Sequence, residues 1–388
     1  MKFAHLADCH VGGWREPALK ELGILSFEKA IDYCIEQNTA FILISGDLLD
    51  TSLPDINVLK RTAGILEKVR EKDISVYIIP GGHDFSPSGK TMLDVLSHSG
   101  LVQDVSKLKD NKLQFTIDKT NTKITGLMGL KGSLDSLHYK NLEKAHLEQE
   151  QGFKIFMFHT ALSEYAAKEF NAQTSKEDLP KNFDYYAGGH VHVIEDVPYD
   201  KGKIAYPGPL FPNNFKELEE LKHGRFIIVD DKLNITRIPI NLKETITHKI
   251  DANSKTPEQI TDELLKIKDV KDKIILLRIE GTLASGKVGD IDFQEVEKNL
   301  DDSYAILKNI HKLTTKEMQE IEMEEGDVNE IETKVIEEYK GQFEIKEDIP
   351  RIILTLDKEK EEGEKNIDFE QRVIKDLIQQ LNLEYLWK

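Results

Sequence analysis

The sequence predicts a layered α/β fold, in which helices flank a β-sheet, over the N-terminal part of the chain. Short β-rich apolar runs alternate there with stretches whose apolar residues follow helical spacing. Most of these apolar runs end in turns that contain glycine or a polar side chain. At 388 residues the chain is also too long for one ordinary core, so more than one domain is expected.

The alternation of strands and helices starts at the N-terminus. We expect helices over residues 18–37, 56–71 and 91–96, followed by a polar helix over 135–151. Strands are expected over residues 3–7, 41–44, 76–79, 153–158, 185–189, 204–209 and 225–229. Residues 113–127 predict two further strands around a turn at residues 118–121.

The pattern changes near residue 242. Strands over residues 245–250 and 273–279 are expected to pair around a helix over 257–267, which makes a small α+β domain. Beyond residue 292 the chain is charged and mostly helical, with expected helices over 316–339 and 369–383 and an expected strand over 349–356. We therefore predict three parts, over residues 1–242, 243–292 and 293–388.

The composition excludes some classes of protein. No apolar run approaches the roughly 20 residues that span a bilayer, and the N-terminus lacks a signal-peptide pattern. Cys9 and Cys34 are the only cysteines, so a reduced, cytoplasmic setting is expected. The net charge is −18, but residues 301–388 hold 24 acidic and 13 basic residues and so carry most of the excess. The charge therefore neither supports nor excludes DNA as a partner.

Polar motifs follow five of the apolar runs in the first 200 residues. They are Asp8-Cys9-His10, Gly46-Asp47, Gly81-Gly82-His83-Asp84, His159 and Gly188-Gly189-His190-Val191-His192. Strand ends at one edge of an α/β sheet are where such folds build sites, and the glycines allow sharp turns. Asp and His together supply oxygen and nitrogen ligands for divalent ions such as Mn, Fe or Zn.

A single histidine is usually a core or surface residue with ordinary hydrogen bonds and not a metal ligand. We take that view of seven of the 12 histidines: His5, His98, His138, His146, His223, His248 and His311. The other five all fall inside the strand-end motifs, which is hard to explain by chance. Such a ligand set suggests two metal ions that share one carboxylate and activate a water for attack on phosphorus.

The order Asp-x-His, Gly-Asp, Gly-x-His-Asp, His and Gly-His-x-His resembles the calcineurin-like metallophosphoesterase superfamily over roughly residues 1–240. Within it, the chain most resembles the meiotic-recombination-eleven nucleases and their SbcD-type relatives, which act in DNA double-strand-break repair. That narrower resemblance rests on the N-terminal run, on Tyr206-Pro207-Gly208 and on the small second domain followed by helices. It implies a β-sandwich flanked by helices, a small capping domain and a helical tail.

The resemblance also implies roles for individual residues. Asp8, His10 and His192 would bind one metal ion, His159 and His190 the other, and Asp47 would bridge the two. His83 would act on the scissile phosphate or the leaving 3′ oxygen, and Asp84 would orient its ring. Capping of a turn or helix is the alternative role for Asp84. Asp50 and Cys9, which lie beside these residues, are taken as structural.

One position departs from the family pattern. The family has Asn before this histidine, as a ligand of the second metal ion, and this chain has Gly82. The second site would then keep Asp47, His159 and His190 as ligands. We therefore expect an active enzyme that requires a higher metal concentration.

The expected function is that of a Mn-dependent DNA exonuclease and endonuclease. It would act with an ABC-type coiled-coil ATPase and form a homodimer, as implied by the resemblance. The helix over residues 369–383 would dock on the ATPase or pack on its own chain. The alternatives are a phosphomonoesterase or cyclic-nucleotide phosphodiesterase with the same metals, and a DNA-binding scaffold whose chemistry has decayed at Gly82.

Overall fold

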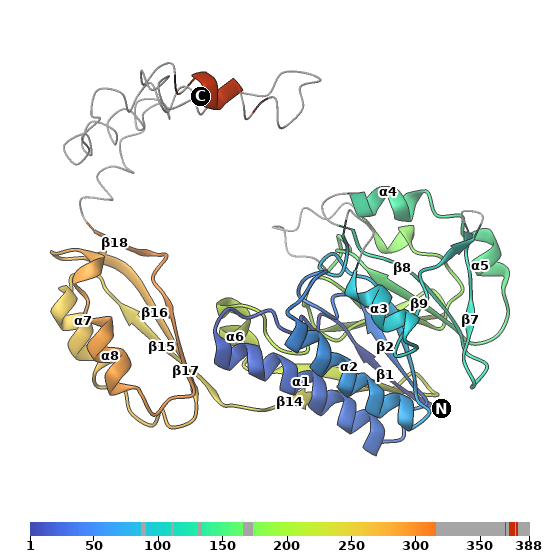
Figure 1. The fold of residues 1–388 in the computed structure, drawn as a ribbon, viewed down its shortest axis with the longest axis horizontal. Helices are drawn as coiled ribbons and strands as arrows, with labels where there is room; N and C mark the ends of the chain where they lie inside the picture. The colour runs from blue at the N-terminus through green and yellow to red at the C-terminus, as the bar shows by residue number, and fades with distance from the viewer. Residues whose placement is uncertain are drawn as a thin grey trace. The chain divides into compact units, whose positions relative to one another are not determined.

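The structure is a computed structural model. It describes residues 1–86, 91–109, 112–130, 134–165 and 174–315, together with 369, 372–376 and 378. The helix expected over 316–339 and the strand expected over 349–356 lie outside the described residues. Within the helix expected over 369–383, the described residues are helical. Figure 1 colours the chain from blue at the N-terminus to red at the C-terminus.

The first sheet has the strand order β14-β13-β1-β2-β3-β4. Its strands are β1 (Lys2–Leu6), β2 (Phe41–Ser45), β3 (Ser75–Ile79), β4 (Gln103–Asp104), β13 (Gly224–Asp230) and β14 (Ile235–Ile240). β1 to β4 are parallel, whereas β13 is antiparallel to both β1 and β14. The chain between the parallel strands forms α1 (Pro17–Glu36), α2 (Ile56–Glu71) and α3 (Met92–His98). These elements confirm the predicted strand–helix alternation.

Local signals in the sequence explain where these helices begin. Pro17 opens α1, where its fixed φ suits a helix and its missing N–H is not needed. The Asp55 side chain caps α2 by accepting from the N–H of Asn57 at 2.7 Å, and Thr91 caps α3 in the same way. Each cap satisfies a backbone donor that the helix itself leaves unpaired.

The second sheet has the strand order β11-β12-β10-β9-β8-β7. Its strands are β7 (Thr116–Ile117), β8 (Lys123–Leu127), β9 (Lys154–His159), β10 (Tyr185–Gly189), β11 (Glu195–Tyr199) and β12 (Gly202–Tyr206). The predicted turn at residues 118–121 joins β7 and β8, which pair antiparallel. Short elements complete this part: β5 (Leu108–Lys109), β6 (Lys112–Leu113), the 3-10 turn Lys176–Asp178 and α6 (Phe215–Leu221).

The polar helix predicted over residues 135–151 is two short helices, α4 (Leu134–Lys140) and α5 (Ala145–Gln149). Tyr139 from α4 and Leu147 from α5 are both buried in the same hydrophobic cluster against the second sheet. The break lets each short helix place one apolar side chain on that sheet. Periodicity alone did not reveal it, because the whole stretch is polar and helical in character.

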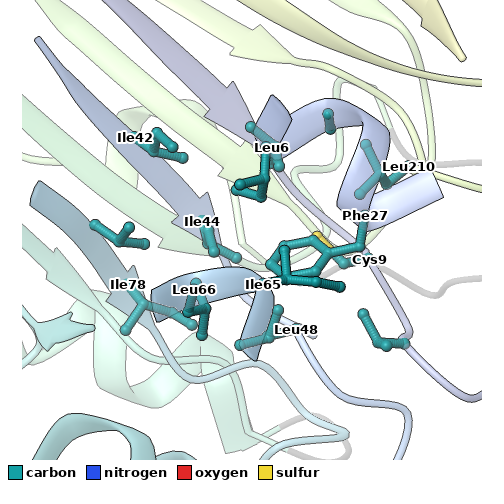
Figure 2. Close-up of a cluster of buried hydrophobic side chains, with 14 of the residues drawn as sticks. Leu6, Cys9, Phe27, Ile42, Ile44, Leu48, Ile65, Leu66, Ile78 and Leu210 are labelled. Carbon is teal, nitrogen blue, oxygen red and sulfur yellow. The ribbon is translucent and has the colours of Figure 1, made fainter. Parts of the chain in front are cut away.

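The two sheets pack face to face, and strand alternation divides their side chains between three cores. In β2, Phe41 and Leu43 point into the core shared by the two sheets, whereas Ile42 and Ile44 point toward α1 and α2. Figure 2 shows this helix-facing cluster, in which Phe27 from α1 and Leu66 from α2 meet the strand residues. Burial on both faces of the sheet explains why the apolar runs are continuous. Each buried large apolar side chain contributes about 1.5–3 kcal/mol to the stability of the folded state.

A separate small sheet follows the sandwich. It contains β15 (Thr245–Asp251), β16 (Ile274–Leu283), β17 (Ala305–Asn309) and β18 (Leu313–Thr315), with α7 (Pro257–Leu264), the 3-10 turn Val288–Asp290 and α8 (Phe293–Asn299). β15 and β16 pair around α7, as predicted. β17 and β18 lie beyond residue 292, in the stretch expected to be mostly helical, and both pair with β16. The division into three domains stays a prediction.

By their internal contacts the residues form two compact units. Of the described residues, the larger contains those within Met1–Asp251, Thr261–Glu280 and Asp292–Lys312, and the smaller contains those within Ala252–Ile260, Gly281–Ile291 and Leu313–Lys388. Both sheets of the sandwich therefore belong to the larger unit. No helix in the described part of the chain is long and apolar enough to cross a membrane.

Candidate metal centre

The side chains predicted to bind metal lie at one edge of the sandwich. β1, β2 and β3 end side by side in the first sheet, and β9 and β10 end side by side in the second. The structure brings together all the residues singled out from the sequence: Asp8, His10, Asp47, His83, Asp84, His159, His190 and His192. His159 is the last residue of β9, and the others follow the ends of their strands.

Five of these residues have a backbone in the left-handed region. Their φ angles are 50° at Asp8, 41° at His10, 52° at Asp47, 98° at His190 and 53° at His192. Such conformations cost of the order of 1–3 kcal/mol each and persist where the surroundings impose them. The backbone turns as it leaves each strand, and these turns direct side chains from separate strands toward one point. The concentration of unfavourable backbone here is typical of a functional site.

The first ligand group contains Asp8, His10 and His192. Nε2 of His10 lies 3.2 Å from Nε2 of His192, and Oδ1 of Asp8 lies 3.8 Å from the same atom of His192. Nδ1 of His192 donates a hydrogen bond to Glu217 at 2.9 Å. In its neutral form the His192 ring therefore turns an unshared electron pair toward His10 and Asp8, which suits a cation among the three side chains.

The second ligand group contains Asp8, Asp47 and His159. Nδ1 of His159 donates to the carbonyl oxygen of Ser45 at 2.8 Å, so Nε2 is the acceptor atom of the neutral ring. That Nε2 is buried, lies 3.1 Å from Oδ2 of Asp47, and has no hydrogen-bond partner among the described residues. Two acceptors that face each other in a dry site require a positive charge between them or beside them. The His190 ring packs against His159, with ring centroids 5.1 Å apart.

Asp8 belongs to both groups, and Asp47 connects them as well. Its Oδ2 atom lies 3.1 Å from Nε2 of His159 and 3.8 Å from Nε2 of His10, while Oδ1 accepts the backbone N–H of His83 at 2.8 Å. The carboxylate is buried, so its charge is poorly screened by water. A carboxylate in this place can contribute to two ion sites at once.

The electrostatics of the site favour positive charge. Burial opposes protonation of His159, yet the carboxylates of Asp47 and Asp8 raise its pKa to about 10. Burial also opposes protonation of His192, yet Asp8 and Glu217 raise its pKa to about 9. Divalent cations satisfy the same demand without protons, and this mixture of carboxylate and imidazole donors suits Mn, Fe or Zn. The donor set therefore fits two divalent ions.

His83 and Asp84 occupy different surroundings. The His83 side chain is 48% exposed, and its Nδ1 donates to the carbonyl oxygen of Asp50 at 2.7 Å. Asp84 is buried and accepts from the backbone N–H groups of Gly81 and Leu49, both at 3.0 Å. Burial and the charge of Asp47 raise the pKa of Asp84 to about 6. The hydrogen bonds of Asp84 match the turn-capping alternative, and the His83 ring is oriented by the backbone of Asp50 instead.

Two residues at the site were not assigned a functional place from the sequence. Glu217 binds His192, and Oδ1 of Asp50 lies 3.2 Å from Nδ1 of His10. From the sequence Asp50 is expected to be structural, although it follows Asp47 closely in the chain. Glu217 lies in an acidic helical stretch that resembles an ordinary solvated face. The one local signal is Asn214 three residues earlier, which caps α6 and places Glu217 in its first turn.

Comparisons with known proteins show which family the chain belongs to. The family model for calcineurin-like phosphoesterases matches residues 1–194, half of the chain. The chain is similar to the DNA double-strand break repair protein Mre11 of Methanococcus maripaludis, with 28% identity over 295 residues that cover 71% of this chain and 77% of the relative. The protein of the same name from Methanocaldococcus jannaschii is 28% identical over 293 residues, which cover 71% and 75%. That from Archaeoglobus fulgidus is 26% identical over 239 residues, which cover 58% and 53%.

Proposed function

The chain belongs to the calcineurin-like phosphoesterase family, and from this premise we propose that it is a Mn-dependent DNA nuclease that works in double-strand-break repair. The names of its relatives support the choice of substrate, and the metal-ligand geometry supports the choice of chemistry. The observation that carries the proposal is the position of Oδ2 of Asp47, between Nε2 of His159 and Nε2 of His10.

Each residue of the two groups has a place in the proposed centre. Asp8, His10 and His192 would hold one ion, His159 and His190 the other, and Asp47 would serve both. When bound, two such ions supply Lewis acidity and a water that loses its proton near neutral pH. Burial of the carboxylates keeps their attraction for cations strong, because little water screens them.

The proposed role of His83 follows from its hydrogen bond and its exposure. Because Nδ1 donates to the Asp50 carbonyl, Nε2 is the atom that can meet a phosphate or give a proton to the leaving 3′ oxygen. The ring packs edge-on against His10, with centroids 4.7 Å apart, which places it beside the first ligand group. Asp84 supports this role indirectly, by holding Gly81 and the loop after β2.

Gly82 makes the two proposed ion sites unequal. It supplies no side-chain donor at the position where the family has Asn. The second ion would therefore depend on Asp47, His159 and His190, and we propose that it binds more weakly than the first. The enzyme would then need higher metal concentrations for full activity.

The wider setting is also part of the proposal. The protein would act in the cytoplasm as a homodimer, with residues 1–242 as the nuclease and 243–292 as a cap that selects the form of DNA. Residues 293–388 would dock on an ABC-type coiled-coil ATPase. The names of the relatives support the repair role. The dimer, the ATPase partner and the cytoplasmic setting come from the resemblance seen in the sequence.

One assay tests the proposed function against its alternatives. The protein with Mn²⁺ would be offered labelled linear duplex DNA, single-stranded DNA and p-nitrophenyl phosphate. Nucleotide release supports the nuclease, colour alone indicates a phosphomonoesterase, and DNA binding without cleavage indicates a scaffold. His83→Ala should slow cleavage by about 10²-fold or more while DNA binding persists. His98→Ala, which changes an exposed histidine on α3, is the matched control, and equal rates for both variants would remove His83 from the mechanism.

A further inference from the structure

Glu217 touches a ligand histidine without belonging to either ligand group. Its Oε1 atom accepts the hydrogen bond from Nδ1 of His192 at 2.9 Å, and its side chain is only 18% exposed. We propose that Glu217 is a positioning residue, which holds His192 so that Nε2 faces the metal and Nδ1 does not. This inference rests on the metal centre of the proposed function.

The chemistry of imidazole explains why such a partner matters. A neutral histidine carries its proton on one ring nitrogen and offers the other to a cation, and the hydrogen bond at the protonated nitrogen decides which is which. A carboxylate at Nδ1 also makes Nε2 a stronger donor of electrons. His192 needs this help because its backbone leaves the sheet in a strained turn, with φ of 53°, and its side chain is 19% exposed.

Glu217 is itself held in place by two neighbours. The backbone N–H of Asn213 donates to Oε2 at 2.8 Å, and the side-chain amide of Asn214 donates to Oε1 at 2.6 Å. Both oxygens of the carboxylate are therefore used, and the side chain has one preferred place. The side chain of Asn213 also bonds to Asp50, the carboxylate near Nδ1 of His10.

The helix that carries Glu217 is anchored within the larger unit. α6 has only seven residues and would not be stable alone. Leu218 is fully buried in a cluster with Leu19 and Leu22 from α1. Glu219 forms a two-pronged ion pair with Arg278, in which Nε of the arginine lies 2.9 Å and 3.0 Å from the two carboxylate oxygens. These contacts anchor α6, which carries Glu217, to α1 and β16.

Metal titration without DNA tests the inference directly. Mn²⁺ binding would be followed by calorimetry for the wild type, Glu217→Ala, Glu217→Gln and Glu220→Gln. Glu220 is exposed on the same helix, so its variant makes the same charge change away from His192. We expect the Glu217 variants to bind one of the two ions about 10–100-fold more weakly, with Gln closer to the wild type because its oxygen still accepts a hydrogen bond. The control should bind both ions normally.

A spectroscopic measurement separates positioning from general damage. Co²⁺ in place of Mn²⁺ reports ligand geometry through its visible absorption, which should change in Glu217→Gln and stay unchanged in Glu220→Gln. Normal affinity and an unchanged spectrum in Glu217→Gln would overturn the inference, and so would an equal loss in the control. If Glu217→Ala does not fold, the same measurements on Glu217→Gln test the inference.

The wild type separates this inference from the proposed function. A wild type that binds two ions but cleaves no DNA would overturn the proposed function and leave this inference intact, whereas one that binds no ion would overturn both.

Discussion

Nε2 of His10 lies 3.2 Å from Nε2 of His192, although the two residues are 182 positions apart in the chain. His10 follows β1 in the first sheet, and His192 follows β10 in the second. The face-to-face packing of the two sheets is what brings these nitrogens together. The unshared electron pairs of the two nitrogens need a proton or a cation between them at this distance. The buried carboxylate of Asp8 beside them favours that positive charge.

Metal binding should therefore stabilise the folded protein. Mn²⁺ at about 100 times its dissociation constant should add about 2.7 kcal/mol and raise the thermal midpoint by roughly 5 °C relative to the protein in EDTA. Asp47→Asn should lose most of this increase, because the shared carboxylate would carry no charge. Asp231→Asn, at an exposed position, should keep it. Scanning calorimetry with and without Mn²⁺ gives the result, and an equal rise in Asp47→Asn would contradict a shared role for Asp47.

Gly82→Asn should strengthen the weaker ion site. The new amide oxygen would restore the donor that the family pattern has at this position, so the second Mn²⁺ should bind about 10-fold more tightly. Gly82→Ala adds a side chain without a donor and is the control for backbone effects. Calorimetric titration compares the three proteins. If Gly82→Asn and Gly82→Ala behave alike, the missing donor is not what weakens the site.

Gly46→Ala should damage the site through one added methyl group. Gly46 has φ of +87°, and a Cβ atom there would lie 2.1 Å from Nδ1 of His159. We expect a loss of about 2–4 kcal/mol in the free energy of unfolding, together with weaker metal binding. Gly64→Ala on α2 is the matched control, since the added Cβ meets no described atom within 4 Å. It should stabilise the protein by about 0.5–1 kcal/mol in urea unfolding. Equal effects of the two substitutions would contradict the tight fit around His159.

His5 should make the metal-free protein less stable in acid. It is fully buried, its Nδ1 lies 2.9 Å from the hydroxyl of Tyr185, and burial lowers its pKa from 6.5 to about 3. Because the folded state resists protonation, the contribution of His5 is complete above pH 6.5 and is lost as the pH falls toward 3. Between pH 7 and 4.5, His5→Asn should therefore lose about 2–3 kcal/mol less stability than the wild type.

Urea unfolding in EDTA at both pH values measures this difference. The other titrating groups are common to the two proteins, so the comparison isolates His5. His98→Asn changes an exposed histidine and should follow the wild type. If His5→Asn loses as much stability in acid as the wild type does, His5 is not the source of the acid sensitivity.

Much of the site could be predicted from the sequence, because its residues follow recognisable strands. Asp8, Asp47 and His159 each come at the end of a continuous apolar run, and parallel strands bring such ends to one edge of a sheet. Residues 135–151 form two short helices instead of the one predicted, because a polar stretch gives no periodic signal of a break. Within the described region, β17 and β18 after residue 292 are not predicted, because they are short and lie in a charged stretch.

The amino-acid sequence by itself determined which side chains could bind metal and on which strands they lie, since apolar periodicity is a local property. The resemblance to known nucleases implied which of them share an ion, but only the tertiary structure shows which of them meet. The pairing of His10 with His192, the position of Asp47 between two groups and the contact of Glu217 with His192 each join segments far apart in the chain. Such contacts depend on how two sheets and a short helix pack. The spacing of residues along the chain carries no information about that packing.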